Sequence, residues 1–300
     1  MSILIVGSVA FDKIKTPFAK SGIVLGGSAT YSSISAAYFN SVNLVGVVGG
    51  DFSKKHLALL NKKKINTEGL VVKTGKTFMW EGEYGWNFSD PKTLATHLGV
   101  FSTFKPCLPK DYKNSKYIFL ANIDPQVQLD VLNQIKRPKL VVCDTMNYWI
   151  ENKLKDLKKV LKRVDIFLLN ESESREFTGS VNLIKAGKQM LSFGPKVIVI
   201  KKGEHGALLF TKKNLFAIPA YLLEEVFDPT GAGDTFAGGF IGYLSNCQKY
   251  NQAALRGAVI YGSIMATFAV ESFSVDKLVS INKHDIENRI KKFKKFIYIK

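Results

Sequence analysis

The chain has 300 residues, of which 46% are hydrophobic and 12% aromatic, a composition typical of a globular protein and not of a disordered chain. No apolar run reaches the roughly 20 residues that a membrane helix needs, so we expect no membrane partner. The net charge of +17 would suit a nucleic-acid binder, but only 5 of the 42 basic residues are arginine and the lysines are spread along the chain, so we expect no nucleic-acid partner either.

Short apolar runs alternate with helical patterns from the first residues onward. Residues 2–7 and 42–49 are predicted strands, because each is a short apolar run that ends at a glycine. Residues 28–39 mix small and apolar side chains, which predicts a helix in close contact with a sheet. Residues 53–63 have the pattern of an amphipathic helix.

The segment 69–105 departs from this alternation. It is rich in β-branched and aromatic residues with glycines between them, a composition that predicts short strands and turns. We expect this segment and residues 12–24 to form a small β insertion together.

The alternation then resumes, and strands that alternate with helices imply a parallel sheet covered on both faces. A β-ribbon is predicted at 207–221 and mostly helical structure at 234–296. Because the pattern shows neither a repeat nor a linker, we expect one α/β domain over residues 1–300. The remaining predicted strands are 117–122, 139–146, 165–170 and 196–203.

Polar side chains follow the ends of several predicted strands. Ligands of sheets of this kind bind beyond the carboxyl ends of the strands, so these side chains are candidates for a site. They are Asp12, Asp51, Asn122, Asp144, Asn147, Asn170, Glu171 and Glu173.

The stretch DPTGAGDTFAGGF at 228–240 places Gly231, Ala232 and Gly233 before Asp234 and a small, apolar run. If Asp234 lies in the first turn of a helix, the preceding N–H groups lie at a helix N-terminus, which attracts anions. Asp234 can then accept the proton of an attacking hydroxyl, as phosphoryl transfer requires. The alternative is a glycine-rich turn in which Asp234 caps the helix.

This stretch closely resembles the second signature of the ribokinase-like (PfkB) carbohydrate kinase family, and the resemblance extends over almost the whole chain. GGSATYSSISAA at 26–37 is similar to the first signature, and GVVGGDF at 46–52 is similar to the Gly-x-Asp turn. Residues 170–173 fit the Asn-x-x-Glu motif, and residues 202–206 resemble the Gly-x-x-Gly turn beside the nucleotide.

The resemblance implies a three-layer α/β/α fold with a mostly parallel central sheet. It implies a small β-sheet lid, formed by about 12–24 and 69–105, that closes on the substrate and often makes the contact of a homodimer. It also implies ATP and Mg²⁺ as cofactors, and a small sugar or nucleoside as the acceptor.

Family roles carry over position by position. Asp234 is implied as the base and residues 231–233 as the anion hole. The residues implied for the acceptor are Asp12, Gly26, Gly27, Tyr31, Asp51 and Trp80. Those implied for the nucleotide are Asn170, Lys201, Gly203 and Gly206, with Glu173 organising Mg²⁺ through water.

Several of these roles have plainer alternatives. Asp12 could be a turn residue after a strand, and Asn170 with Glu173 could cap the helix that starts at Glu171. Asp144 and Asn147 resemble a polar family segment near the phosphates, but they could equally form a simple turn at a strand end.

The chain departs from the family pattern at three places. Tyr31 stands where the first signature usually has asparagine, and it could offer its hydroxyl to the acceptor or stack on a ring. Lys201 stands where threonine or serine is frequent, and it could reach a phosphate. Asp228 and Thr230 match one side of a monovalent-cation site, so K⁺ is a candidate cofactor, although the segment 269–274 lacks the expected glycine.

The predicted lid carries five aromatic residues, Trp80 among them, between positions 78 and 88. They could form an aromatic wall over the acceptor, or a hydrophobic patch buried in a lid–lid dimer.

Cysteines indicate the compartment. Cys107, Cys143 and Cys247 are odd in number and far apart, which argues against a disulfide framework. We therefore expect a cytoplasmic protein.

The motifs, together with the resemblance, imply an ATP-dependent kinase that phosphorylates a hydroxymethyl group of a small sugar or sugar-like acceptor. A nucleoside (adenosine-like) kinase of the same family and a catalytically silent sugar- or nucleotide-binding protein are the alternatives.

Overall fold

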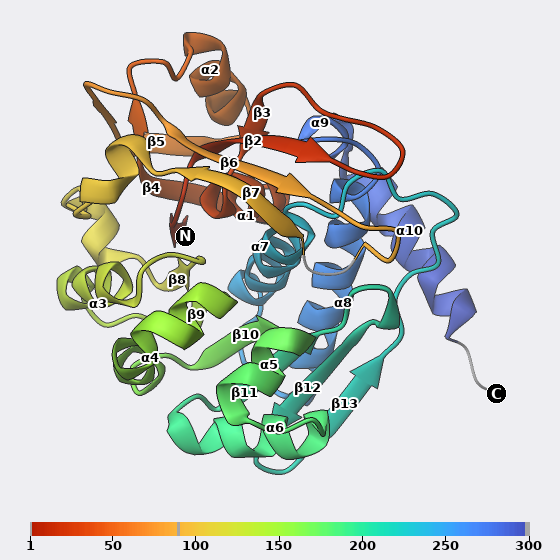
Figure 1. The fold of residues 1–300 in the computed structure, drawn as a ribbon. Helices are drawn as coiled ribbons and strands as arrows, with labels where there is room; N and C mark the ends of the chain where they lie inside the picture. Colours follow the sequence, from red (N-terminus) through yellow and green to blue (C-terminus); the bar gives the residue numbers. More distant parts are fainter. Residues whose placement is uncertain (1, 89–90, 298–300) are drawn as a thin grey trace.

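A computed structural model describes residues 2–88 and 91–297 of the chain. Among these residues a nine-stranded sheet forms the centre of the molecule (Figure 1). In spatial order its strands are β13 (Leu215–Ile218), β12 (Ala207–Thr211), β11 (Val197–Lys201), β10 (Ile166–Asn170), β9 (Leu140–Cys143), β8 (Tyr117–Leu120), β1 (Ser2–Val6), β4 (Ser41–Gly49) and β5 (Ile65–Lys73).

The sheet is parallel from β5 to β11, and β12 and β13 close one edge as an antiparallel ribbon. Strands β8 and β9 are buried at every residue, because a parallel sheet with helices on both faces leaves its strands no contact with water. This explains why the predicted strands are continuous apolar runs. The mostly parallel central sheet is confirmed.

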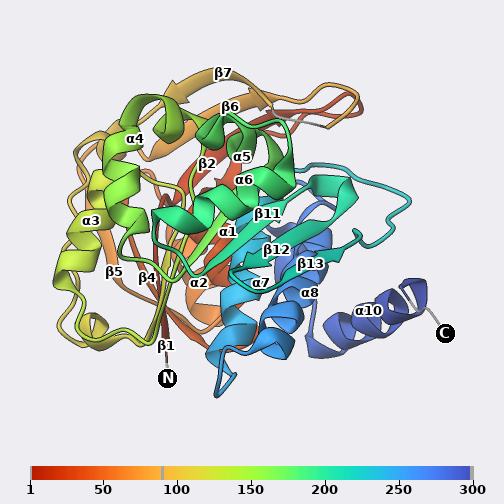
Figure 2. The ribbon, with the colours of Figure 1, turned by 90° about the horizontal axis from the view of Figure 1, so that it is seen from below.

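Helices cover both faces of this sheet, and Figure 2 shows the two helical layers on either side of it. One layer consists of α3 (Pro125–Gln134), α4 (Asn147–Leu161), α5 (Glu171–Thr178) and α6 (Leu183–Met190). The other consists of α1 (Ser28–Ala36), α2 (Lys54–Lys62), α7 (Ala232–Ser245), α8 (Gln252–Ala269), α9 (Asp276–Ser280) and α10 (Lys283–Phe296). Each layer closes its own hydrophobic core, so the expected three-layer α/β/α fold is confirmed.

A second, four-stranded sheet lies beside this body, at the top of Figure 1. We call it the small sheet. Its strands, in spatial order, are β3 (Val24–Gly26), β2 (Ala10–Lys15), β6 (Phe78–Glu83) and β7 (Lys92–His97). The outward side chains pair as ions, for example Lys13 with Glu81 at 3.1 Å.

The bounds of the small sheet differ from the expectation. Residues 65–73 are the edge strand β5 of the central sheet, so the second segment begins at Phe78 and not at 69. Residues 99–103 are a 3₁₀-helix and lie outside it. A β-branched, glycine-containing run suits either sheet equally, and only the parallel pairing of β5 with β4 decides between them.

The apolar run after Asp234 is the buried helix α7, which lies against α1 and α8. It approaches α1 closely: Ser35 Oγ donates to the Thr235 carbonyl at 2.7 Å, and a Cβ at Gly238 would lie 2.3 Å from the Ser32 carbonyl oxygen. Small residues therefore allow two helices of the same layer to meet at backbone distance.

Candidate active site

The first turn of α7 is the place where the sequence suggests an anion hole. Gly231 precedes the helix in the left-handed region, with φ of 74°. The Ala232 N–H donates to the Pro229 carbonyl at 3.2 Å. In the part of the chain that the structure describes, the N–H groups of Gly231 and Gly233 have no intramolecular acceptor. Two of the three expected donors are thus open to an anion at a helix N-terminus.

Tyr31 of α1 lies directly against this turn. A Cβ at Gly231 would lie 2.5 Å from the Tyr31 ring, so only glycine fits there. The Tyr31 hydroxyl is buried without a hydrogen-bond partner among the described residues. Burial, followed by the charge of Asp12, raises the pKa of this hydroxyl well above its ordinary value. A buried, unpaired donor among carboxylates is a group that a ligand can satisfy.

Asp12 projects from the middle of β2 and is only 5% exposed. Its carboxylate occupies the space beside Gly26, where a Cβ would lie 1.9 Å from Oδ2. Burial, and then the charges of Asp228 and Asp234, raise its pKa from 3.8 to about 7, although the Gly27 N–H donates to it. The structure therefore places Asp12 inside the site and not in a surface turn.

Asp234 and Asp228 complete a group of carboxylates. Asp234 is half-buried in the first turn of α7, and burial and the charge of Asp144 raise its pKa to about 7 against the opposing effect of Lys201. Burial raises the pKa of Asp228 to about 6. A carboxylate with a pKa near neutrality suits a general base.

Asp228 shapes the segment that leads into the anion hole. Its Oδ1 accepts the Thr230 N–H at 2.8 Å, whereas its Oδ2 is buried without a partner among the described residues. The Thr230 hydroxyl and the Tyr84 hydroxyl lie 3.1 Å apart. Because Tyr84 follows β6, this contact joins the small sheet to the anion hole.

Lys201 brings a positive charge to the opposite side of the turn. It ends β11, and its Nζ lies 2.7 Å from Asp144 Oδ2. A Cβ at Gly233 would lie 3.2 Å from the same Nζ, so the amine stands beside the anion hole. Asp144, whose role the sequence left open, is therefore part of the site.

Asn170 and Glu173 form a capping box at the start of α5. Asn170 Oδ1 accepts the Glu173 N–H at 2.8 Å, and Glu173 Oε2 accepts the Asn170 N–H at 2.6 Å. The plainer alternative is thus present in the structure. It does not exclude a second role: burial lowers the pKa of Lys201, but the charges of Asp144 and then of Glu173 outweigh it and raise that pKa.

The remaining candidates follow strands β4 and β11 or lie on strand β6. Gly203 and Gly206 form a turn with positive φ after β11. Trp80 of β6 is the register partner of Asp12 and shares its face of the small sheet, and its Nε1 donates to Thr93 Oγ1 at 3.2 Å. Asp51 follows β4 and is exposed.

Thr77 was not singled out from the sequence. Asp51 Oδ1 accepts its N–H at 2.8 Å and its hydroxyl at 2.6 Å, so Asp51 holds the start of β6. The sequence indicates Tyr84 only as one of five aromatic residues in the predicted lid. No local pattern distinguishes either residue, because their partners lie far away in the sequence.

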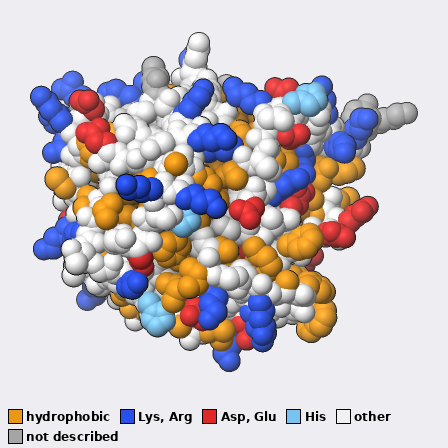
Figure 3. Space-filling model, turned by 90° about the horizontal axis from the view of Figure 1, so that it is seen from above, with side chains coloured by type: hydrophobic (Ala, Val, Ile, Leu, Met, Phe, Trp, Pro, Cys, Tyr) orange, Lys and Arg blue, Asp and Glu red, His pale blue; other side chains and the backbone are white. Residues whose placement is uncertain are grey.

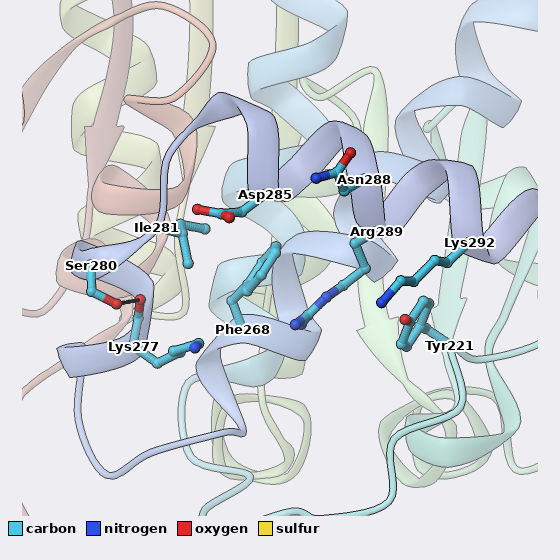
Figure 4. A pocket seen from close by; sticks show the side chains of 9 residues that line it. All are labelled: Tyr221, Phe268, Lys277, Ser280, Ile281, Asp285, Asn288, Arg289 and Lys292. Atoms are coloured by element: carbon cyan, nitrogen blue, oxygen red, sulfur yellow. Dashed lines mark hydrogen bonds between the residues drawn. The ribbon is translucent and has the colours of Figure 1, made fainter.

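A cavity of about 320 Å³ lies away from these residues, between the end of α8 and helices α9 and α10 (Figure 4). Arg289 crosses it and stacks on Phe268, with Cζ 3.7 Å from the ring centroid. The guanidinium group also pairs with Glu271 and donates to the Thr267 hydroxyl. The candidate site lies instead at the carboxyl edge of the sheet, where Asp144 follows β9 and Lys201 ends β11.

The surface charge, the metal-binding side chains and the helix lengths of the described part of the chain point to no further site. On the face in Figure 3, lysines and arginines are distributed among acidic and apolar side chains. Within residues 2–88 and 91–297, no three His, Cys, Asp or Glu side chains are grouped as a metal cage would require. Over the same ranges no helix has both the length and the apolar character of a membrane span.

Solved structures share this architecture over almost the whole chain. A ribokinase from Giardia lamblia aligns with a TM-score of 0.81 at 20% identity, covering 97% of this chain and 99% of that one. An aminoimidazole riboside kinase from Salmonella enterica, solved with its riboside and an ATP analogue, aligns with a TM-score of 0.78 at 17% identity, covering 97% and 100%. The fold is therefore the ribokinase fold.

Sequence comparison identifies the family. Residues 22–281 match the pfkB family carbohydrate kinases. A cytidine kinase from Thermococcus kodakarensis is 31% identical over 263 residues, which cover 86% of this chain and 93% of that protein. The chain belongs to the pfkB family, as its motifs indicate.

Proposed function

We propose that this protein transfers the γ-phosphoryl group of ATP to a hydroxymethyl group of a small sugar or nucleoside. The observation that carries the proposal is the placement of the Asp234 carboxylate beside the open N–H groups of Gly231 and Gly233. A general base and an anion hole are the two groups that transfer to an alcohol needs from the protein.

In the proposed reaction, the acceptor hydroxyl gives its proton to Asp234 and its oxygen bonds to the γ-phosphorus. The bond from that phosphorus to the bridging oxygen of ADP breaks, and ADP leaves with the electron pair. The N–H groups at the start of α7 and the Lys201 ammonium stabilise negative charge on the transferring group. Because the pKa of Asp234 is raised to about 7, its carboxylate is a stronger base than an ordinary aspartate.

Glu173 and Asn170 would hold Mg²⁺ and its waters near the ATP phosphates, and the ion would offset the charge of the phosphates. Magnesium prefers oxygen ligands and keeps several of its waters. A single buried carboxylate such as that of Glu173 is therefore a suitable protein ligand, and a full set of protein ligands is not needed. We assign Asn170, Gly203 and Gly206 to the nucleotide side of the site. Asp228, with its unpaired buried oxygen, and Thr230 are candidates for K⁺.

Asp12, Gly26, Gly27 and Tyr31 would hold the acceptor, with Asp51 and Trp80 at its rim. The Tyr31 hydroxyl can bond an acceptor oxygen or nitrogen. The small sheet would act as a lid, because Tyr84 already bonds Thr230 beside the anion hole. It also exposes Phe18 and Trp86 at 66% and 79%, which favours a homodimer through this sheet in a cytoplasmic enzyme.

A nucleoside acceptor has its own support. The relative that is 31% identical is a cytidine kinase, and Trp80 faces the same side as Asp12 and could stack on a base. A catalytically silent binding protein would need neither a base nor a lysine beside the anion hole, so we consider it the weaker alternative.

The test is ADP release from Mg-ATP with a panel of sugars, polyols and nucleosides, for the wild type and Asp234→Asn. We expect turnover with one acceptor class and a loss of about 10²- to 10⁴-fold in the variant. Asp276→Asn, which also changes a first-turn aspartate of a helix but at an exposed position, should retain activity.

Turnover with nucleosides alone would favour the nucleoside kinase. Equal turnover by Asp234→Asn would show that Asp234 is not the base. A folded wild type that neither turns over nor binds Mg-ATP in calorimetry would refute the kinase proposal.

A further inference from the structure

The ion pair between Lys201 and Asp144 lies at the centre of the site. Asp144 follows β9 and Lys201 ends β11, so the pair spans the end of the intervening strand β10, where Asn170 is the register partner of Lys201. Their side chains are only 3% and 15% exposed. The Lys201 Nζ atom that pairs with Asp144 also lies beside Gly233.

Asp144 is itself firmly held. Its Oδ1 accepts the Thr145 N–H at 2.9 Å, which leaves Oδ2 for the lysine. Its backbone carbonyl accepts Gln128 Nε2 at 3.1 Å. A lysine has a long, flexible side chain, and a fixed carboxylate restricts it to one position.

Stability alone is a poor explanation for such a pair. Removing two charges from water costs about as much as their attraction returns, so buried ion pairs rarely stabilise a fold. The chain also contains an exposed pair of the same kind: Lys196 Nζ lies 2.9 Å from Asp165 Oδ1, with exposures of 80% and 30%, and Asp165 Oδ2 accepts the Val141 N–H. That pair lies at the amino edge of the sheet, away from the anion hole.

We propose that Asp144 is a positioning residue for phosphoryl transfer, which holds the Lys201 ammonium beside Gly233 where negative charge gathers on the transferring group. This inference rests on the proposed kinase function. Asp144 touches neither the acceptor hydroxyl nor the phosphoryl group in this role, and acts on the reaction through Lys201.

Asp144 also faces the base. The charged and titratable groups around Asp234 are Asp12 from β2, Tyr31 from α1, Asp144 after β9 and Lys201 from β11. Asp144 raises the pKa of Asp234 and Lys201 lowers it. Neutralising either partner of the pair should therefore move the acid limb of the pH profile, in opposite directions.

The experiment is a double-mutant cycle of Asp144→Asn and Lys201→Met, with kcat and KM measured for the acceptor found in the panel. We expect kcat to fall about 10- to 100-fold in Asp144→Asn, from misplacement of the amine, and about 10²- to 10³-fold in Lys201→Met. KM for the acceptor should change little. The double variant should be no slower than Lys201→Met, because Asp144 acts through the lysine.

The acid limb of kcat/KM should shift to lower pH in Asp144→Asn and to higher pH in Lys201→Met. Asp165→Asn and Lys196→Met are the matched controls and should leave kcat and the limb unchanged. If Asp144→Asn does not fold, Asp144→Ser, which can still accept the Thr145 N–H, replaces it in the cycle.

Additive losses in the cycle, or losses equal to those of the Asp165→Asn control, would overturn the positioning role while leaving the kinase intact. An unmoved acid limb would also count against it. A wild type without turnover and without Mg-ATP binding in calorimetry would overturn the kinase proposal, and this inference with it.

Discussion

At the scale of single residues, the site concentrates negative charge in a poorly solvated place. Asp12, Asp228 and Asp234 each have a pKa raised toward neutrality, chiefly by burial. A buried carboxylate whose charged form is disfavoured reduces the stability of the fold, and such groups are characteristic of functional sites. This allows a prediction about stability that needs no acceptor.

Asp12→Asn should stabilise the protein at pH 8. The folded-state pKa of Asp12 is about 7 and its ordinary value is 3.8, so the folded state binds the extra proton between these values and stability falls as pH rises through that window. Asparagine removes this loss. The free energy of unfolding, from urea titrations, should exceed that of the wild type by about 1.4 kcal/mol or more at pH 8, the equivalent of one pKa unit.

The same gain should largely disappear at pH 3, below the ordinary pKa of 3.8, where Asp12 is protonated in both states. Asp276→Asn, at an exposed position, should show no such pH-dependent gain. A gain that is equal at both pH values would contradict the raised pKa.

Gly231→Ala should reduce both stability and activity. The φ of 74° is unfavourable for alanine, and its Cβ would meet the Tyr31 ring at 2.5 Å. We expect a loss of about 1–3 kcal/mol in the free energy of unfolding. Gly22→Ala, where no atom lies within 4 Å of the new Cβ, is the control and should change stability by less than about 0.5 kcal/mol.

At the scale of elements, the proposed active site is an assembly of chain segments that are distant in sequence. Strand β2 supplies Asp12, α1 supplies Tyr31, β11 supplies Lys201, and α7 supplies the anion hole and Asp234. The small sheet reaches this assembly through the Tyr84–Thr230 contact. If that contact holds the lid closed, its loss should increase the amount of ATP that is hydrolysed without phosphorylation of the acceptor.

Tyr84→Phe should loosen the lid and leave the chemistry in place. Loss of one hydrogen bond should raise the acceptor KM about 2- to 10-fold. More ATP should be hydrolysed per acceptor phosphorylated, because water enters a less closed site. Parallel assays of ADP and phosphorylated acceptor measure this ratio. Tyr148→Phe, at an exposed tyrosine, should leave the ratio unchanged, and an unchanged ratio in Tyr84→Phe would argue against the latch.

At the scale of the whole molecule, the proposed homodimer depends on apolar surface at the tip of the small sheet. Phe18 and Trp86 lie with their ring centroids 5.5 Å apart and are largely exposed. Such a cluster is an association site in many proteins. The rest of this sheet's outer face carries ion pairs, so association should involve the tip.

The double variant Phe18→Ser/Trp86→Ser should be a monomer under conditions in which the wild type sediments as a dimer. Two buried aromatic anchors contribute strongly to an interface, and serine removes them. Val181→Ser, which changes another exposed apolar residue, should leave the sedimentation coefficient unchanged. A wild type that is monomeric at all concentrations would exclude this dimer.

Much of the fold could be predicted because its signals are local. Continuous apolar strands, and glycines followed by a small, apolar run at 231–240, are properties of short segments. The order of motifs also identified the family. The bounds of the small sheet could not be predicted, since residues 69–73 suit either sheet until β5 pairs with β4.

The residue types and the order of the motifs are properties of the sequence, and they predict an anion hole at 231–233, Asp234 as the candidate base, and the strand–helix alternation that builds a parallel sheet. The pairing of Asp144 with Lys201, the contact of Tyr84 with Thr230 and the packing of Tyr31 against Gly231 appear only in the folded chain. Ion pairs, pKa values and close contacts depend on distances between residues that are 57, 146 or 200 positions apart, and no local pattern encodes such distances.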